Sequence, residues 1–202
     1  MFKKIGIGVT IAFMCLFSIY GCDVIEPGHV GIKVNLYGEQ KGVQNYTLRT
    51  GAIWYNRFSE QVYEFPTFMQ NAVWTQSSDE GSPTDESVTF NSSEGAVVNT
   101  DIALSYQIDK DKVPEIFVEL RQDADYITHT YMRGKVRDAI NRIASTMKVT
   151  DVFGEGKQKL LLDAKKELER ELGHKGFIID MIAFVGEMRV DAKVLDSINL
   201  TI

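Results

Sequence analysis

The side chains that could do chemistry are spread along this sequence without a catalytic pattern. The histidines are His29, His129 and His174, and none has a second metal ligand at the spacing that zinc sites use. The sequence contains no G-x-S-x-G nucleophile elbow, no P-loop and no dinucleotide-binding glycine motif. We therefore expect no enzymatic activity, no metal and no cofactor. A hydrolase whose triad is scattered in sequence is the least favoured alternative.

The densest group of carboxylates lies in the segment 75–86, which reads TQSSDEGSPTDE. Its four acids could bind a hard cation, but the ordered Asp, Asn and Gly spacing of a calcium loop is missing. Gly81 and Pro83 disfavour regular structure, and almost nothing in the segment is apolar. We therefore predict an exposed loop.

Cysteine chemistry is confined to the N-terminus, because Cys15 and Cys22 are the only cysteines. The rest of the chain therefore has no disulfide and no thiol, and its core alone must hold it together.

The N-terminal segment has the composition of a membrane anchor or a signal sequence. Lys3 and Lys4 precede an uncharged apolar run from Ile5 to Cys22, which is about long enough to span a bilayer. The lysines predict a cytoplasmic N-terminus, with the domain on the opposite, periplasmic or equivalent, side. The residues expected to anchor the chain are Lys3, Lys4, Ile5, Phe13, Leu16 and Phe17.

Two forms of membrane attachment fit this segment. The apolar run can remain as an uncleaved single-pass helix, which is the favoured interpretation. Residues 19–22 (IYGC) also resemble the cleavage site of a bacterial lipoprotein, in which Cys22 would carry the lipid.

A long strand near the middle of the chain organises the rest. Apolar and polar side chains alternate from Val98 to Ile108, which is typical of a half-buried strand. Residues 88–90 continue the alternation, and residues 91–95 predict a hairpin turn with Gly95 at positive φ. Such a strand cannot stand alone, so other strands and at least one helix must cover it.

Further elements follow from the periodicity on either side of this strand. Strands are predicted at 30–36, 43–48, 52–55, 61–65, 68–74 and 176–185, and helices at 109–120, 124–147, 157–172 and 191–198. Thr150 is predicted to cap a turn, and Leu161 to begin the apolar stripe of the third helix. The strand at 176–185 is apolar almost throughout, which predicts burial on both faces or a subunit contact.

The charge pattern bears on partners. The net charge of −6 argues against nucleic acid as a partner. A basic set on the second helix, comprising Arg133, Lys135, Arg137 and Arg142, could meet anionic lipid or an acidic neighbour, or could be a solvated face in which Asp138 supports Arg142. The candidate subunit contacts are Arg133, Arg137, Lys159, Lys165 and Lys166.

Several phrases occur in an order that resembles the SPFH or band-7 family of prohibitins, stomatins and flotillins. They are residues 26–32 (EPGHVGI), 64–66 (EFP), 94–101 (EGAVVNTD) with 105–108 (SYQI), and 132–140 (MRGKVRDAI). The likeness covers residues 24–200 and is closest to prohibitins and to bacterial Hfl-type regulators of the FtsH protease.

This resemblance implies an α+β SPFH domain of mostly antiparallel strands with packed helices, divided into subdomains at 23–86 and 87–202 after the anchor at 1–22. It also implies a homo-oligomer, or a hetero-oligomer with a related subunit, that forms a ring or cage on membrane lipid, organises a microdomain and can regulate an FtsH-type AAA protease. The family usually continues into a coiled coil near the point where this chain ends. The alternative function is a monomeric lipoprotein module with one ligand site.

Overall fold

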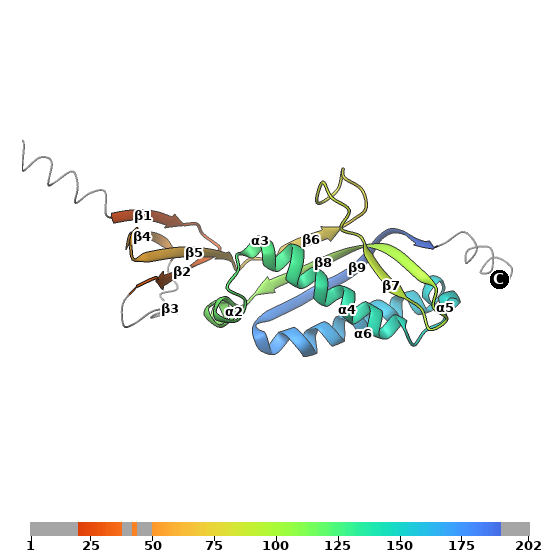
Figure 1. The fold of residues 1–202 in the computed structure, drawn as a ribbon. Coiled ribbons are helices and arrows are strands. Elements are labelled where there is room, and N and C mark those ends of the chain that lie inside the picture. The colour runs from red at the N-terminus through yellow and green to blue at the C-terminus, as the bar shows by residue number, and fades with distance from the viewer. Residues whose placement is uncertain (1–19, 38–41, 44–49, 191–202) are drawn as a thin grey trace, which may run out of the picture. The chain divides into compact units, whose positions relative to one another are not determined.

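The computed structural model describes residues 20–37, 42–43 and 50–190, which fall into two compact units (Figure 1). The first unit runs to Phe68 and also includes Lys110–Asp123, whereas the second comprises Met69–Asp109 and the chain from Ala124 onward. The predicted division between residues 86 and 87 therefore differs from the observed one. A boundary inferred from the order of elements could not show that the chain returns to its first unit.

The mixed α+β class with antiparallel sheets is confirmed. The anchor residues up to position 19 and the helix expected at 191–198 lie outside the described residues. In the part of the chain that the structure describes, no helix is both long enough and apolar enough to cross a membrane.

The first unit contains two small antiparallel sheets. One pairs β1 (Tyr20–Ile25) with β4 (Gly51–Asn56), and the other has the order β3 (Gly42–Val43), β2 (His29–Asn35), β5 (Glu60–Pro66). Of the strand predicted at 43–48, only the start lies among the described residues.

Close packing in this unit depends on a glycine and a distant helix. A Cβ on Gly31 would lie 2.8 Å from the Ile25 side chain, which would have to move to accept any larger residue at this position. Helix α2 (Val113–Leu120) places Phe117 with its ring centroid 4.5 Å from that of Tyr63 and 6.0 Å from that of Phe65. Aromatic pairs at these distances add to the stabilisation that burial provides.

The C-terminal limit of the predicted anchor segment is wrong. Residues 20–22 belong to β1, where Tyr20 pairs with Asn56 and Gly21 with Tyr55. Composition does not distinguish the last residues of an apolar membrane segment from the first residues of a strand. The predicted segment therefore ends at residue 22, although β1 begins at Tyr20.

The second unit is built on one antiparallel sheet around β8 (Val97–Ile108). Strand β9 (Phe177–Val190) pairs with one edge of β8, while β6 (Gln70–Trp74) and β7 (Val88–Asn91) lie end to end along the other edge. The predicted alternation is confirmed, because the inward side chains of β8 are all buried: Val98, Thr100, Ile102, Leu104, Tyr106 and Ile108. The hairpin turn between β7 and β8 is also confirmed, with Gly95 at φ +79°.

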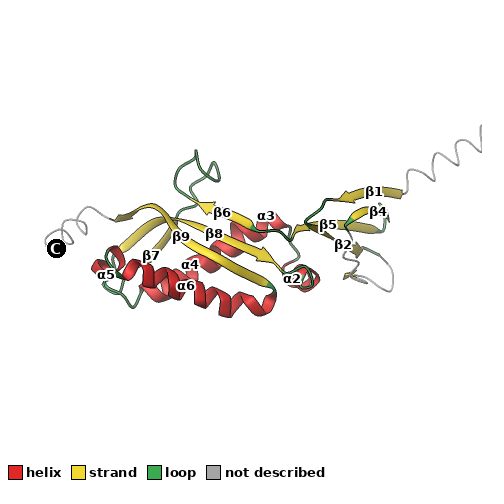
Figure 2. Ribbon diagram, turned by 180° about the vertical axis from the view of Figure 1, so that it is seen from behind, coloured by secondary structure: helices red, strands yellow, loops and turns green. Residues whose placement is uncertain are grey.

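Helices cover one face of this sheet (Figure 2). They are α3 (Ala124–Tyr126), the π-helical segment η1 (Ile127–Met132), α4 (Arg133–Ala144), α5 (Val149–Phe153), α6 (Gly156–Leu172) and the 3₁₀ turn η2 (Gly173–Lys175). The continuous helix predicted at 124–147 is thus interrupted by a π segment. Lys148, not Thr150, precedes α5, and the buried stripe of α6 begins at Leu160 rather than Leu161.

Strand β9 is buried on one face only. Phe177, Ile179 and Ile182 are buried, but Ile178 is 52% exposed and Met181 46% exposed. A bulge at Asp180, between Ile179 and Met181, sets the two faces out of simple alternation. The prediction of burial on both faces is therefore wrong, and the alternative of a subunit contact stays a prediction.

Candidate interaction site

The acidic loop is an insertion in one edge of the second unit's sheet. Trp74, the last residue of β6, pairs with Ile102, and Val88, the first residue of β7, pairs with Thr100. Only Asp101 separates the two partners on β8, so residues 75–87 leave the sheet edge and return almost to the same point. The predicted loop is confirmed, and its closed form is that of an Ω-loop.

Backbone and hydroxyl hydrogen bonds close the base of this loop. The Glu86 amide donates to the Thr75 carbonyl over 2.9 Å, and both residues are buried. The Thr75 hydroxyl lies 3.0 Å from the carbonyl of Ser77 and 2.7 Å from that of Glu80. The loop therefore holds its shape through its own contacts.

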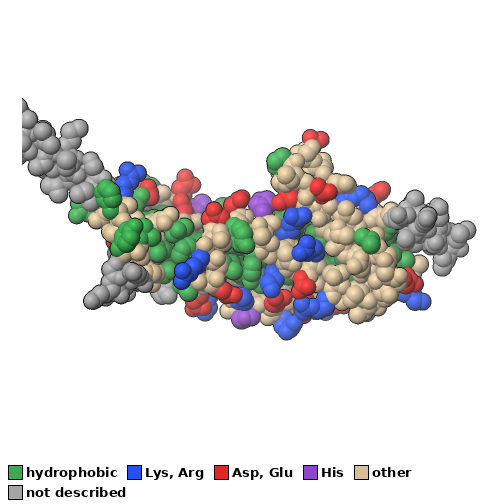
Figure 3. Space-filling model, in the orientation of Figure 1, with side chains coloured by type: hydrophobic (Ala, Val, Ile, Leu, Met, Phe, Trp, Pro, Cys, Tyr) green, Lys and Arg blue, Asp and Glu red, His purple; other side chains and the backbone are tan. Residues whose placement is uncertain are grey.

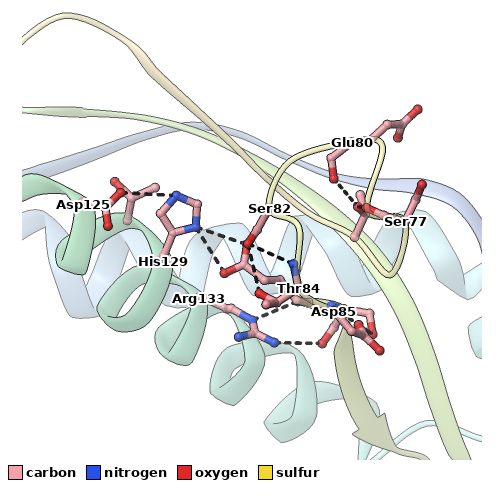
Figure 4. Close-up of polar contacts among 12 residues, drawn as sticks. Ser77, Glu80, Ser82, Thr84, Asp85, Asp125, His129 and Arg133 are labelled. Carbon is pink, nitrogen blue, oxygen red and sulfur yellow. Dashed lines mark hydrogen bonds and ion pairs between the residues drawn. The ribbon is translucent and has the colours of Figure 1, made fainter.

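A histidine on η1 ties the loop to the helices (Figure 4). Nδ1 of His129 lies 3.2 Å from Oε2 of Glu86, and Nε2 lies 3.7 Å from Oδ1 of Asp125. The Glu86 side chain is only 9% exposed, so its charge needs this partner. The two carboxylates approach opposite ring nitrogens, and this geometry does not let them converge on one ion.

Arg133 fixes the same end of the loop from the first turn of α4. Its Nε donates to the Glu86 carbonyl over 2.9 Å, and Nη2 lies 3.4 Å from the Ser87 carbonyl. The guanidinium therefore binds backbone of its own chain through two of its nitrogens.

A second ion pair holds the point where the sheet edge is interrupted. Both oxygens of Asp101 accept from Arg189 on β9, over 2.8 and 2.6 Å, and the Gln76 amide donates to Oδ1 over 3.0 Å. The hydrogen bonds from Arg189 lower the pKa of Asp101 below its ordinary value, against the opposing effect of burial. The same contact raises the pKa of Arg189.

The π segment carries His129 and is held to the sheet through its neighbour Thr128. The Thr128 hydroxyl donates to the Ala124 carbonyl over 2.9 Å and lies 2.7 Å from the Tyr106 hydroxyl, which therefore donates to it. Burial raises the pKa of Tyr106, so this phenol stays protonated and keeps the bond. π-helical turns are rare and frequently occur at functional sites.

The predicted contact residues have different surroundings. Lys165 binds the Asp180 carbonyl and Glu169, and Lys166 pairs with Asp163. Lys135 pairs with Glu171 and Arg142 with both Asp138 and Glu167. Arg137 and Lys159 are exposed and have no hydrogen-bond or ion-pair partner among the described residues.

Most charges of α6 therefore have partners within the chain, and Lys159 is the exception named above. Among the described residues, no group of three or more His, Cys, Asp or Glu side chains could hold a metal ion. What the site offers is an acidic loop held by its own hydrogen bonds, an arginine on α4 (Arg137) that has no partner among the described residues, and an exposed apolar row on β9, which suit contact with another macromolecule.

Sequence reasoning missed two of the site's contacts. It placed Asp101 on the polar face of the strand and found no metal ligand near His129, but their partners Arg189 and Glu86 are 88 and 43 residues away. The only available signal was the presence of charged residues on strands and at a helix start, which does not specify a pairing.

The fold and this site define an α+β domain suited to interaction. The model of the SPFH domain / Band 7 family matches residues 23–201, and the chain belongs to this family. Proteins of the family are membrane-associated and generally non-enzymatic scaffolds. No protein of curated function matches the chain.

Proposed function

We propose that this protein is a membrane-anchored scaffold whose copies assemble into a ring or cage that organises a membrane microdomain. The observation that carries the proposal is the family match, which begins at residue 23, directly after the apolar segment expected to anchor the chain. The domain then sits beside the membrane surface, where association in two dimensions favours assembly.

The open face of the second unit's sheet supports assembly. Ile178 and Met181 are exposed on β9, and the half-buried Ala183 and Val185 continue their row. Contiguous apolar side chains on a surface typically mark a protein contact. A subunit contact over this face would remove them from water.

The partners proposed are membrane lipid, further copies of this chain or a related SPFH subunit, and a membrane AAA protease of the FtsH type. The protease is proposed from the resemblance to prohibitins and Hfl-type regulators alone. A ring around such an enzyme would control which substrates reach it.

The size of the detergent-extracted full chain tests this function. We expect mass photometry in mild detergent to find particles of many subunits, and carbonate washing of membranes to leave the protein in the pellet. A particle of one subunit across the accessible concentration range would contradict the scaffold.

The form of attachment is tested separately at Cys22. Cleavage before Cys22 would remove Tyr20 and Gly21 from β1, where both are paired with β4. We therefore expect intact-mass analysis to find Met1 or Phe2 at the N-terminus without acyl chains, and Cys22→Ser to remain membrane-bound. A mature chain that begins at a lipidated Cys22 would show that the lipoprotein alternative is right.

A further inference from the structure

Arg137 is the basic side chain of α4 that has no partner among the described residues. Of the basic side chains on this helix, Arg133, Lys135 and Arg142 are bound to groups of their own chain. Arg137 is exposed, and the described residues offer it no hydrogen-bond or ion-pair partner. A guanidinium prefers a planar, two-oxygen acceptor such as a carboxylate.

Two adjoining pockets meet at Arg137. One is lined by His129, Thr130, Arg133, Gly134 and Arg137, and the other by Thr89, Phe90, Asn91, Gly134, Arg137, Asp138 and Asn141. The hollow is open above Gly134, because a Cβ added to this residue would meet nothing within 4 Å. Basic side chains gather on the face of the second unit seen in Figure 3, and Arg133 and Arg137 line the hollow.

The loop between β6 and β7 carries the complementary charge. Asp79 and Glu80 lie in the turn at 77–80 of this loop, both are exposed, and their carboxylates have no partner among the described residues. Figure 1 shows the loop standing out from the sheet, and Figure 3 shows acidic atoms at its outer end. Gly81 has φ +80°, and a Cβ added to it would lie 2.6 Å from the Val73 carbonyl. This part of the loop therefore packs closely against the backbone of β6.

From these two surfaces, and resting on the proposed function, we propose that the acidic loop of one copy docks in the Arg137 hollow of the next, with Asp79 and Glu80 facing the guanidinium. The loop protrudes and the hollow is concave, so the two surfaces are complementary in shape as well as in charge. Because the loop is already fixed by its own hydrogen bonds, little conformational entropy is lost on docking.

The contact is head to tail, because each copy presents one loop and one hollow. Heterologous contacts of this kind close into rings when the rotation between neighbours permits it. Other exposed acids of the second unit, such as Asp151 and Glu155 on and beside α5, lie on the body of the unit rather than on a protruding segment. They serve as matched controls.

The test is a charge swap in the full chain, measured by mass photometry in mild detergent over a dilution series. Arg137→Glu alone, and Asp79→Lys with Glu80→Lys, should each raise the concentration at half-assembly at least about tenfold, because like charges then face each other. The chain that carries all three substitutions should assemble like the wild type. Asp151→Lys with Glu155→Lys, and Lys148→Glu, should change nothing.

The outcomes separate this contact from the proposed function. The docking is supported if Arg137→Glu and the Asp79→Lys, Glu80→Lys variant (the single-sided variants) both lose assembly and the chain with all three substitutions (the swapped chain) recovers it. A large wild-type particle that both single-sided variants retain overturns the docking and leaves the scaffold standing. Failure of the swapped chain to recover also overturns it, provided that circular dichroism shows a folded protein. A wild-type monomer contradicts the scaffold, and the docking with it.

Discussion

Ile102→Asp should unfold the second unit or destabilise it by at least about 4 kcal/mol. Ile102 is 0% exposed in the middle of β8, and its register partners are Trp74 on β6 and Phe184 on β9. The substitution removes a large apolar side chain and leaves a carboxylate where no described group can pair with it. Either effect alone costs several kcal/mol.

The tryptophans allow this loss to be measured in the second unit alone. Trp74 is 0% exposed beside Ile102, whereas Trp54 lies in the first unit and is 66% exposed. Urea unfolding can be followed by Trp74 fluorescence in a Trp54→Phe background. The urea concentration at the unfolding midpoint should be much lower for Ile102→Asp than for the parent chain. Leu162→Asp on α6 is the control, since a similar change at a side chain that is 54% exposed and lies outside the β9 face should cost less than about 1 kcal/mol. Equal midpoints for the two variants would contradict the burial pattern.

The core of the second unit could be predicted because its pattern is local. Alternation along β8 is set by the pleat, so the sequence distinguishes the inward Ile102 from the outward Asp101 without knowledge of their neighbours. The prediction for β9 rested on a different signal, its nearly continuous apolar run, which does not show that the face carrying Ile178 and Met181 is exposed.

The candidate site could not be predicted because it depends on pairings between distant segments. The sequence identified the loop at 75–86 and the basic side chains of α4, and these are correct as elements. It could not show that Arg133 binds the loop's own backbone while Arg137, one helical turn later, stays free. Helical periodicity places both residues near one face, so only the position of the loop distinguishes them.

The rigidity of the loop connects the fold to the proposed contact. Glu86 and Asp101 fix its two ends through His129 and Arg189, which belong to the helical layer and to β9. A loop held from both sides fixes the backbone positions of Asp79 and Glu80. Weakening either anchor should therefore weaken assembly as well as stability, although the acids at the end of the loop are unchanged.

Asp101→Asn should destabilise the second unit by about 1–3 kcal/mol at neutral pH, the range for hydrogen bonds that involve charged groups. The change removes the charge that accepts from Arg189 over 2.6 and 2.8 Å and leaves a half-buried guanidinium without its partner. Asp180→Asn, the same change at an exposed position of β9, should leave the urea midpoint of Trp74 fluorescence within about 0.5 kcal/mol of the wild type.

The pH dependence of this difference follows from the lowered pKa of Asp101. Because Arg189 lowers the pKa in the folded state, the ionised carboxylate stabilises the fold, and this contribution is complete above the unfolded-state pKa of about 3.9. It disappears as the pH falls through the lowered folded-state pKa, where the wild-type carboxylate becomes protonated. The stability gap between wild type and Asp101→Asn should therefore be constant from pH 7 to about pH 5 and narrow below about pH 4. A gap that keeps its full size at the lowest pH at which both proteins fold would show that the charge of Asp101 is not what stabilises the sheet edge.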